Sequence, residues 1–140
     1  MADSSSPAAG MMAVAASAMQ AQQARMRIIA ENLANADSVS KSAGGDPYRR
    51  QVPVFTPVTL PDGEQGVSLT RVAQDQTAFR TQYQPGHPSA DAKGYVKLPN
   101  VDPMVEALDM REAQRAYQAN LTVIETFKTM ESDTIAVLNK

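Results

Sequence analysis

The hydrophobic pattern predicts a long helix near the start of the chain. Residues 11–37 contain neither Gly nor Pro and are rich in Ala, Gln, Met and Arg, which suit a helix. Small and apolar side chains recur there at alternating steps of three and four, interrupted once by a glutamine: Met12, Ala15, Met19, Gln22, Met26, Ile29, Leu33 and Ala36. This spacing is typical of a coiled-coil-like seam and predicts one unbroken helix.

A second long helix is predicted over residues 103–138. Asp102 can accept an N-cap hydrogen bond, and Pro103 suits the first helical position because that position needs no amide donor. One row again steps by three and four, through Ala113, Ala116, Asn120, Val123, Phe127, Met130, Thr134 and Val137. A second apolar row lies beside it, formed by Tyr117, Leu121, Ile124 and Leu138.

The sequence between the two predicted helices indicates turns and short strands. Serines, a Gly-Gly pair and Asp-Pro predict a loop over residues 38–47. The runs "YRRQVPVFTPV", "GVSLTRVAQ" and "AFRTQY" predict short strands, and Pro53 and Pro57 limit the first to a sheet edge. Residues 83–102 combine prolines, glycines and the only histidine, and we interpret them as a stiff joint in which Tyr95 anchors the return to the second helix.

These elements predict a mainly α fold in which the terminal helices pack as a coiled-coil-like pair. We expect a flexible tail over residues 1–10, a helical core from residues 11–37 and 101–140, and a loop and small irregular β region over residues 38–100. Helices of roughly 40 and 55 Å exceed what so small a β region can cover. Partner subunits are therefore expected on Met19, Gln22, Met26, Ile29, Leu33, Tyr117, Asn120, Leu121, Ile124 and Phe127.

Polar residues on these rows have two interpretations. Asn32, Asn35 and Asn120 either fix the register of helix pairing or are simply exposed. For Asn120 and Gln22 we predict the register role, because a misaligned pairing would bury an amide without its polar partner.

Composition narrows the possible functions. A formal net charge of −2 with mixed signs gives no basic face for nucleic acid or an anionic membrane. The absence of cysteine excludes disulfides, thiolate catalysis and Cys-ligated zinc. The first residues lack the features of a cleaved signal, and no segment approaches the apolar length of a membrane span. Without tryptophan, and with three Phe and four Tyr, the chain has little bulky core material.

Candidate chemistry is sparse. His87 with Asp91 or Asp75 could act as an acid, a base or a metal ligand, but the spacing is not diagnostic, and a histidine in such a turn-rich loop is more often structural. The glycines of "SAGGDPY" do not match a phosphate-binding pattern, and the early methionines match packing better than a soft-metal site. We expect no catalytic residue, cofactor, metal or small-molecule substrate.

Three segments together resemble bacterial flagellar basal-body rod proteins: "IIAENLANADS", "GGDPYRRQVPVF" and "LPNVDPMVEALDMREAQRAYQANLTVIET". The resemblance spans roughly residues 28–126, and "GDPYRR" with "PGHPSADAKGYVKLPNVD" is similar to the short subunit of the proximal rod within that family. The matching motif positions are Asn32, Asn35, Tyr48, Arg49, Gly86, His87, Pro88, Gly94, Tyr95, Asn100, Asp102, Arg115, Tyr117 and Asn120.

The resemblance implies a structural subunit without enzymatic activity. Such a subunit would pack helically with its own copies and with other rod and basal-body proteins, in the drive shaft that transmits torque around the export channel. It would pass through the flagellar type III export apparatus without a cleaved signal and reside in the periplasmic part of the rod. The alternatives are a helical export chaperone or adaptor that binds one client, and a small hydrolase that uses His87.

Overall fold

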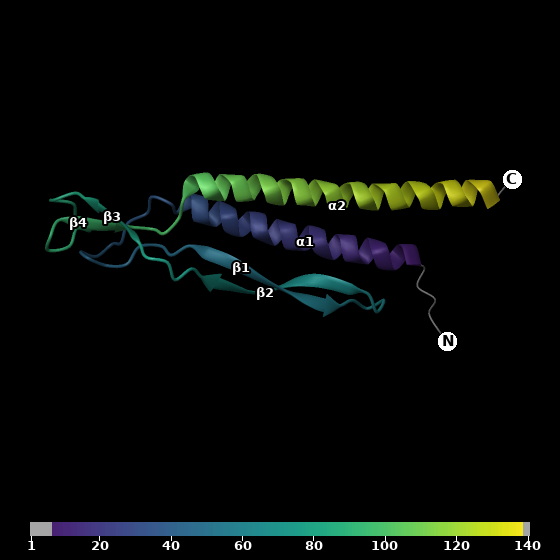
Figure 1. Ribbon diagram of the computed structural model, residues 1–140, viewed down its shortest axis with the longest axis horizontal. Helices are drawn as coiled ribbons and strands as arrows, with labels where there is room; N and C mark the ends of the chain where they lie inside the picture. The colour runs from purple at the N-terminus through teal and green to yellow at the C-terminus, as the bar shows by residue number, and fades with distance from the viewer. Residues whose placement is uncertain (1–6, 139–140) are drawn as a thin grey trace.

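The computed structural model describes residues 7–138 and shows an elongated, mainly α molecule with two antiparallel strand pairs (Figure 1). The helices are α1, Pro7–Ala34, and α2, Pro103–Leu138. The strands are β1, Gln51–Thr59, β2, Gln65–Gln74, β3, Arg80–Tyr83, and β4, Tyr95–Leu98. The two helices lie side by side, and the β1–β2 hairpin runs along α1. The β3–β4 hairpin lies beyond the end of the pair at which α1 ends and α2 begins.

Both predicted helices are present, with changed bounds for the first. Helix α1 begins at Pro7, so residues 7–10 of the expected flexible tail are helical, and residues 1–6 of that tail lie outside the described residues. Pro7 suits the first position of α1 because that position, like the one that Pro103 takes in α2, needs no amide donor. Helix α1 ends at Ala34 instead of residue 37, because the Asn35 N–H already shares the carbonyls of Glu31 and Asn32 in a tightening last turn.

The start of α2 is as predicted from its capping chemistry. The Asp102 Oδ1 atom accepts a hydrogen bond from the backbone N–H of Met104 at 2.9 Å. The helix is described as far as Leu138, and residues 139–140 of the predicted core lie outside the described residues.

Helix α1 is packed on two sides, by α2 and by the β1–β2 hairpin. Its buried residues are therefore spread around the helix and include positions outside the predicted seam, such as Ser17, Ala21, Ile28 and Asn32. Helix α2 has neighbours on one side, and its buried residues are Glu106 and Ala113. The buried face of α1 is therefore wider than the narrow seam predicted from the sequence, because the hairpin also packs against this helix. Coiled-coil packing of the two helices is not confirmed.

The β region is more regular than expected. Strands β1 and β2 pair antiparallel from Gln51↔Gln74 to Thr59↔Gln65, with a bulge between Val54 and Phe55. Among the described residues β1 pairs only with β2, which agrees with the edge position predicted from its prolines. Strand β4 was not predicted: it lies inside the supposed joint and pairs with β3 from Arg80↔Leu98 to Tyr83↔Tyr95.

Candidate functional site

The region around His87 is a turn held by local hydrogen bonds. The His87 Nδ1 atom accepts a hydrogen bond from the Ser89 N–H at 3.0 Å, and Gly86 and Gly94 adopt φ angles of 91° and 85°. The Asp91 Oδ1 atom accepts the N–H groups of Lys93 and Tyr95. The hydrogen bond from Tyr95, aided by that from Lys93 and its charge, lowers the pKa of Asp91 against the opposing effect of burial.

This turn does not form a catalytic cluster with the other candidate acid. Asp75 accepts the Thr77 N–H at 2.9 Å and lies within 3.5 Å of the Arg50 guanidinium, so both predicted aspartates have structural partners. No group of three or more His, Cys, Asp and Glu side chains within residues 7–138 is placed to hold a metal ion. The motif residues Pro88 and Tyr95 belong to the same turn and its exit, where the Tyr95 ring lies 5.2 Å from that of Tyr83.

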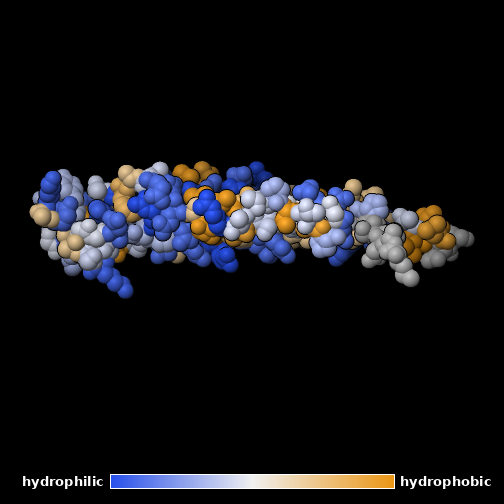
Figure 2. All heavy atoms as spheres, turned by 90° about the horizontal axis from the view of Figure 1, so that it is seen from below, coloured by the Kyte–Doolittle hydropathy of each residue, from blue (hydrophilic) through white to orange (hydrophobic). Residues whose placement is uncertain are grey.

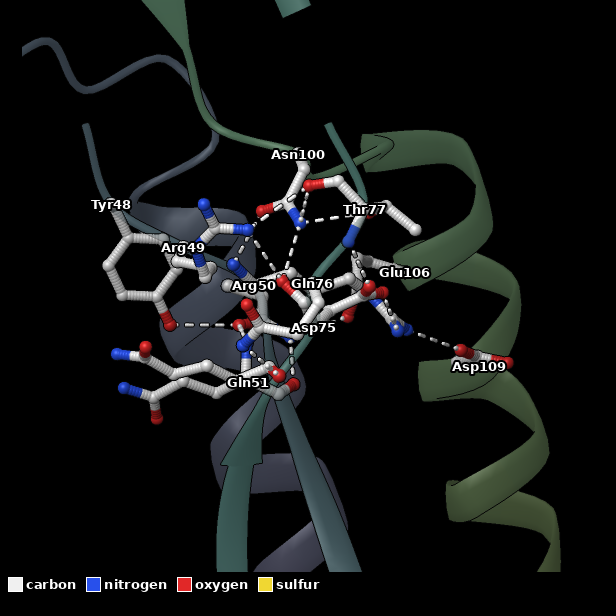
Figure 3. Close-up of polar contacts among 12 residues, drawn as sticks. Tyr48, Arg49, Arg50, Gln51, Asp75, Gln76, Thr77, Asn100, Glu106 and Asp109 are labelled. Carbon is white, nitrogen blue, oxygen red and sulfur yellow. Dashed lines mark hydrogen bonds and ion pairs between the residues drawn. The ribbon is translucent and has the colours of Figure 1, made fainter. Parts of the chain in front are cut away.

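A larger constellation joins the helices to the β region. We call it the polar junction and define it as Asn32, Tyr48, Arg49, Arg50, Gln51, Asp75, Thr77, Asn100, Glu106 and Asp109 (Figure 3). Its side chains come from the end of α1, the residues at and just before the start of β1, the segment after β2, the segment that leads into the α2 cap and the first turns of α2.

Asn32 is the centre of the polar junction on the α1 side. It is fully buried, and its Nδ2 donates to the Gln51 carbonyl at 2.9 Å and to Glu106 Oε2 at 3.2 Å. Its Oδ1 accepts the Tyr48 hydroxyl at 2.8 Å and the Gln51 N–H at 2.9 Å. A buried amide that uses both polar ends fixes its neighbours in one arrangement.

Glu106 is the corresponding residue of α2, and it is a fully buried carboxylate. Its Oε1 accepts a short hydrogen bond from Arg50 Nε, while Arg50 also lies 3.5 Å from Asp75 and 3.6 Å from Asp109. Burial acts to lower the pKa of Arg50, but the hydrogen bond and charge of Glu106 and the two aspartates outweigh it, so the pKa is raised. The pair joins the start of α2 to the start of β1.

Arg49 and Asn100 hold the segment that follows β2. Asn100 accepts the Arg50 N–H at 2.8 Å and donates to the Asp75 carbonyl and the Thr77 hydroxyl at 3.0 and 2.9 Å. Arg49 Nη1 donates to the carbonyls of Asp75 and Thr77, and its guanidinium lies 4.2 Å above the Phe79 ring. The polar junction therefore sets how the β region is oriented relative to the helices.

The structure brings together only part of the motif set. Asn32, Tyr48, Arg49 and Asn100 meet in the polar junction, whereas Asn35 donates to the Glu31 carbonyl of its own helix and Arg115 is exposed on α2. Sequence reasoning missed five members of the polar junction: Arg50, Gln51, Thr77, Glu106 and Asp109. One signal was available for the carboxylate: Glu106 stands seven residues before Ala113 and so continues the buried row of α2.

The expected interface residues lie along the helix pair. Ile29 is buried, and the others, Met19, Gln22, Met26, Leu33, Tyr117, Asn120, Leu121, Ile124 and Phe127, are partly exposed. The amides predicted to pair with polar groups across the seam do not do so: Asn120 donates to Ala116 of its own helix at 2.9 Å, and the buried Gln22 Oε1 has no donor among the described residues. Within this chain neither amide therefore has a polar partner across the seam, and a register role between chains stays a prediction.

The end of α2 and the start of α1 form an apolar surface away from the polar junction. Two adjoining grooves of about 460 and 370 Å³ share Pro7, Met11 and Phe127, and we call them together the distal groove. Met130 and Ile135, which line the groove, and Val137 and Leu138, which follow it, are exposed by 54 to 79%. Apolar side chains gather near this end in the space-filling view (Figure 2).

No helix within residues 7–138 combines the length and the apolar character that crossing a membrane would require.

Comparison with known proteins identifies the two ends of the chain first. Residues 12–40 match the family model described as flagella basal body rod protein, and residues 92–137 match that described as flagellar basal body rod FlgEFG protein C-terminal. These matches cover most of α1, β4 and nearly all of α2, and they define the chain as a protein of the flagellar rod class.

Curated relatives refine the family. The chain is 43% identical over 125 residues to the flagellar basal-body rod protein FlgC of Escherichia coli O6:H1, covering 89% of this chain and 92% of the relative. It is 40% identical over 126 residues to FlgC of Agrobacterium fabrum, with 89% and 91% covered. The chain belongs to the FlgC family of flagellar basal-body rod proteins, which are structural proteins and not enzymes.

Proposed function

We propose that the chain is a structural subunit of the proximal rod of the flagellar basal body, where it packs helically with its own copies and with other rod and basal-body proteins. The observation that carries the proposal is the contrast along α2, which is fixed by the polar junction at its start and exposes apolar side chains at its end. Such a surface is suited to association, because apolar area removed from water contributes about 25 cal/mol per Å².

The arrangement of the helices favours an extended assembly. Helix α2 has 36 residues against 28 in α1 and projects past it at the distal end (Figure 1). If an exposed patch on one copy packs against a different patch on the next, repetition by rotation and rise generates an open helix. Such a helix can enclose the export channel.

The polar junction suits the transmission of torque. An ion pair with a fully buried carboxylate, and two buried or half-buried amides, connect α1, α2, β1 and the segment after β2. Because each group is held by partners from other segments, the β region would turn together with the helices. Rigidity of this kind is what a drive shaft requires.

Export and location form part of the same proposal. The chain would reach the periplasmic part of the rod through the flagellar type III export apparatus without a cleaved signal, as the family resemblance implies. The near-neutral charge supports partners that are proteins rather than nucleic acids or lipids.

The alternative of an export chaperone or adaptor differs in a measurable way. A chaperone would form a soluble complex of fixed size with one client, whereas a rod subunit would be retained in purified basal bodies. Family membership favours the rod subunit.

The direct test is electron microscopy of isolated basal bodies that carry the chain, combined with the variant Ile135→Asp. We expect the chain in the rod, with its helices around the axis, and a large loss of incorporation in the variant, because Ile135 lines the distal groove and is 54% exposed. The control is Glu125→Asp, an exposed α2 residue outside the groove. Normal incorporation of Ile135→Asp, or the chain outside the rod, would contradict the proposal.

A further inference from the structure

The β1–β2 hairpin meets α1 along different edges in its two halves. Near its base, the Gln51 N–H of β1 donates to Asn32 Oδ1 at 2.9 Å, so this N–H points away from β2. Near its tip, the Val67 N–H of β2 donates to Ser17 Oγ at 3.2 Å and points away from β1. The bulge in β1 lies between the two contacts, and bulges increase the twist of a strand pair. The edge that faces α1 therefore changes from β1 to β2, and the strands cross in the view of Figure 1.

The hairpin is attached to α1 differently at its base and near its tip. The base belongs to the polar junction, in which Asn32 both accepts the Gln51 N–H and donates to the Gln51 carbonyl. Near the tip, the polar contact is the Ser17 hydroxyl, which is 8% exposed and also donates to the Val14 carbonyl at 2.7 Å. A hydroxyl that donates one hydrogen bond and accepts another has its orientation fixed. A short side chain thus fastens the tip half of the hairpin to the helix.

Close packing accompanies this hydrogen bond. A Cβ atom added at Gly66 would lie 2.8 Å from Ser17 Oγ and 3.0 Å from the Leu60 side chain. Seven residues before Ser17, on the same side of α1, a Cβ atom added at Gly10 would lie 3.0 Å from Glu64 Cγ at the hairpin tip. The absence of side chains at both glycines therefore lets the hairpin approach the helix closely.

The fastened tip reaches the distal groove. Glu64 lines the part of the groove with a volume of about 370 Å³, together with Met11 of α1 and with Val123 and Phe127 of α2. Among the described residues that line the distal groove, Glu64 alone comes from the hairpin. The shape of this part of the groove therefore depends on where the tip lies on α1.

From these contacts we infer that Ser17 is a positioning residue for assembly. Its hydroxyl fastens the hairpin tip to α1 and so keeps Glu64 in the wall of the distal groove. Without this hydrogen bond the hairpin keeps its base, because Asn32 of the polar junction lies about 22 Å further along α1, but the tip is free to move off the helix. The inference rests on the proposed function, since it takes the distal groove as an assembly surface.

Two substitutions release the tip by different routes. Ser17→Ala removes the acceptor of the Val67 N–H, and Gly66→Ala places a methyl group against the Ser17 hydroxyl. Each variant should be incorporated about fivefold less into purified basal bodies, the factor that corresponds to the loss of a hydrogen bond of roughly 1 kcal/mol. Ser68→Ala is the matched control, because Ser68 is an exposed serine of the same strand.

A disulfide can replace the hydrogen bond, which separates a positioning role from a general role in α1. The chain has no cysteine, and the close approach of Gly10 to Glu64 puts the pair Gly10→Cys and Glu64→Cys near the separation that a disulfide requires. Combined with Ser17→Ala, this pair should form a disulfide, seen on a non-reducing gel, and should restore incorporation to the level of the same pair with Ser17 intact. Either cysteine substitution alone, combined with Ser17→Ala, should not restore it.

The outcomes distinguish the positioning role from the proposed function. Wild-type incorporation of both Ser17→Ala and Gly66→Ala overturns the inference, as does a loss that the disulfide leaves unchanged, or failure of the disulfide to form with Ser17 intact. Loss of incorporation in Ile135→Asp beside wild-type incorporation of the two hairpin variants would leave the rod function standing without the positioning role. Wild-type incorporation of all three variants would contradict both.

Discussion

The two ends of α2 satisfy their side chains in opposite ways. Its first turn places Glu106 in full burial, where Arg50 and Asn32 both contact the carboxylate. Its last turns expose Ile135, Val137 and Leu138. At the first end Glu106 finds its partners within the same chain, whereas the apolar side chains of the last turns stay exposed.

The two ends of α2 differ because of the elements that pack beside them, more than because of their local sequence. At its start, α2 is reached by the β1 end and by α1, so even a charged side chain finds partners. Near its end, α2 extends past the start of α1, and no other described element covers it. An isolated helix in water gains little stability from such an end, and association with other chains would supply the missing burial.

The largest effect is expected for Glu106→Ala. Removing the fully buried carboxylate takes away two charge-assisted hydrogen bonds, from Arg50 and from Asn32, and leaves Arg50 with only its longer contacts to Asp75 and Asp109. Each such bond is worth about 1.5 to 3 kcal/mol, so a total loss of about 3 to 5 kcal/mol is expected. The free energy of unfolding of the monomer should fall by that amount in urea denaturation. Glu112→Ala is the control, since its side chain is 69% exposed, and a change within about 0.5 kcal/mol is expected. Equal losses for the two variants would contradict the contrast.

A second comparison sets Phe127 against Ile28. Ile28 of α1 is only 1% exposed. Phe127 of α2 lines both parts of the distal groove and is only partly buried. Ile28→Ser should destabilise the monomer by about 2 to 4 kcal/mol, and Phe127→Ser should mainly weaken assembly, by about 1.5 to 3 kcal/mol. Monomer unfolding and incorporation into basal bodies measure the two effects. Similar monomer losses for both would assign Phe127 to an internal core.

These contrasts also explain what the sequence could predict. The start of α2 follows from Asp102 and Pro103, because capping is local chemistry, and the helical rows reveal both helices. Strand β4 was missed because its four residues lie among turn residues and form a strand only by pairing with β3, twelve or more positions earlier in the chain. Pro7 was read as part of a tail, although proline also begins helices.

The polar junction could be predicted only in part. Family motifs named Asn32, Tyr48, Arg49 and Asn100 but not their common location. Glu106 in an amphipathic helix looks like a solvated acid, and its burial depends on Arg50, 56 residues away. Local patterns do not carry information about such a long-range pair.

A smaller effect is expected when low pH protonates Asp75, whose carboxylate accepts the Thr77 N–H in the segment after β2. The Thr77 N–H hydrogen bond lowers the pKa of Asp75 below its ordinary value of 3.8, helped by Arg50 and opposed by burial. Because the native pKa is the lower one, this stabilisation is fully present above about pH 4 and is lost as the pH falls through the native pKa. Urea denaturation between pH 6 and pH 2 should show a shallower loss of stability for Asp75→Asn than for the wild type. Parallel curves would show that the carboxylate does not contribute in this way.

The smallest effect on the monomer is expected for Asn120→Leu, at the edge of the distal groove. The Asn120 amide already donates to the Ala116 carbonyl, so its replacement leaves no donor in another segment unpaired. Leucine favours helix and adds apolar area, and the unfolding free energy should change by less than about 1 kcal/mol. Within the rod the outcome tests a different question, because a register role can now lie only between chains. Disordered rods with a stable monomer would assign Asn120 to such contacts, whereas ordered rods and normal swimming would show that its amide serves its own helix alone.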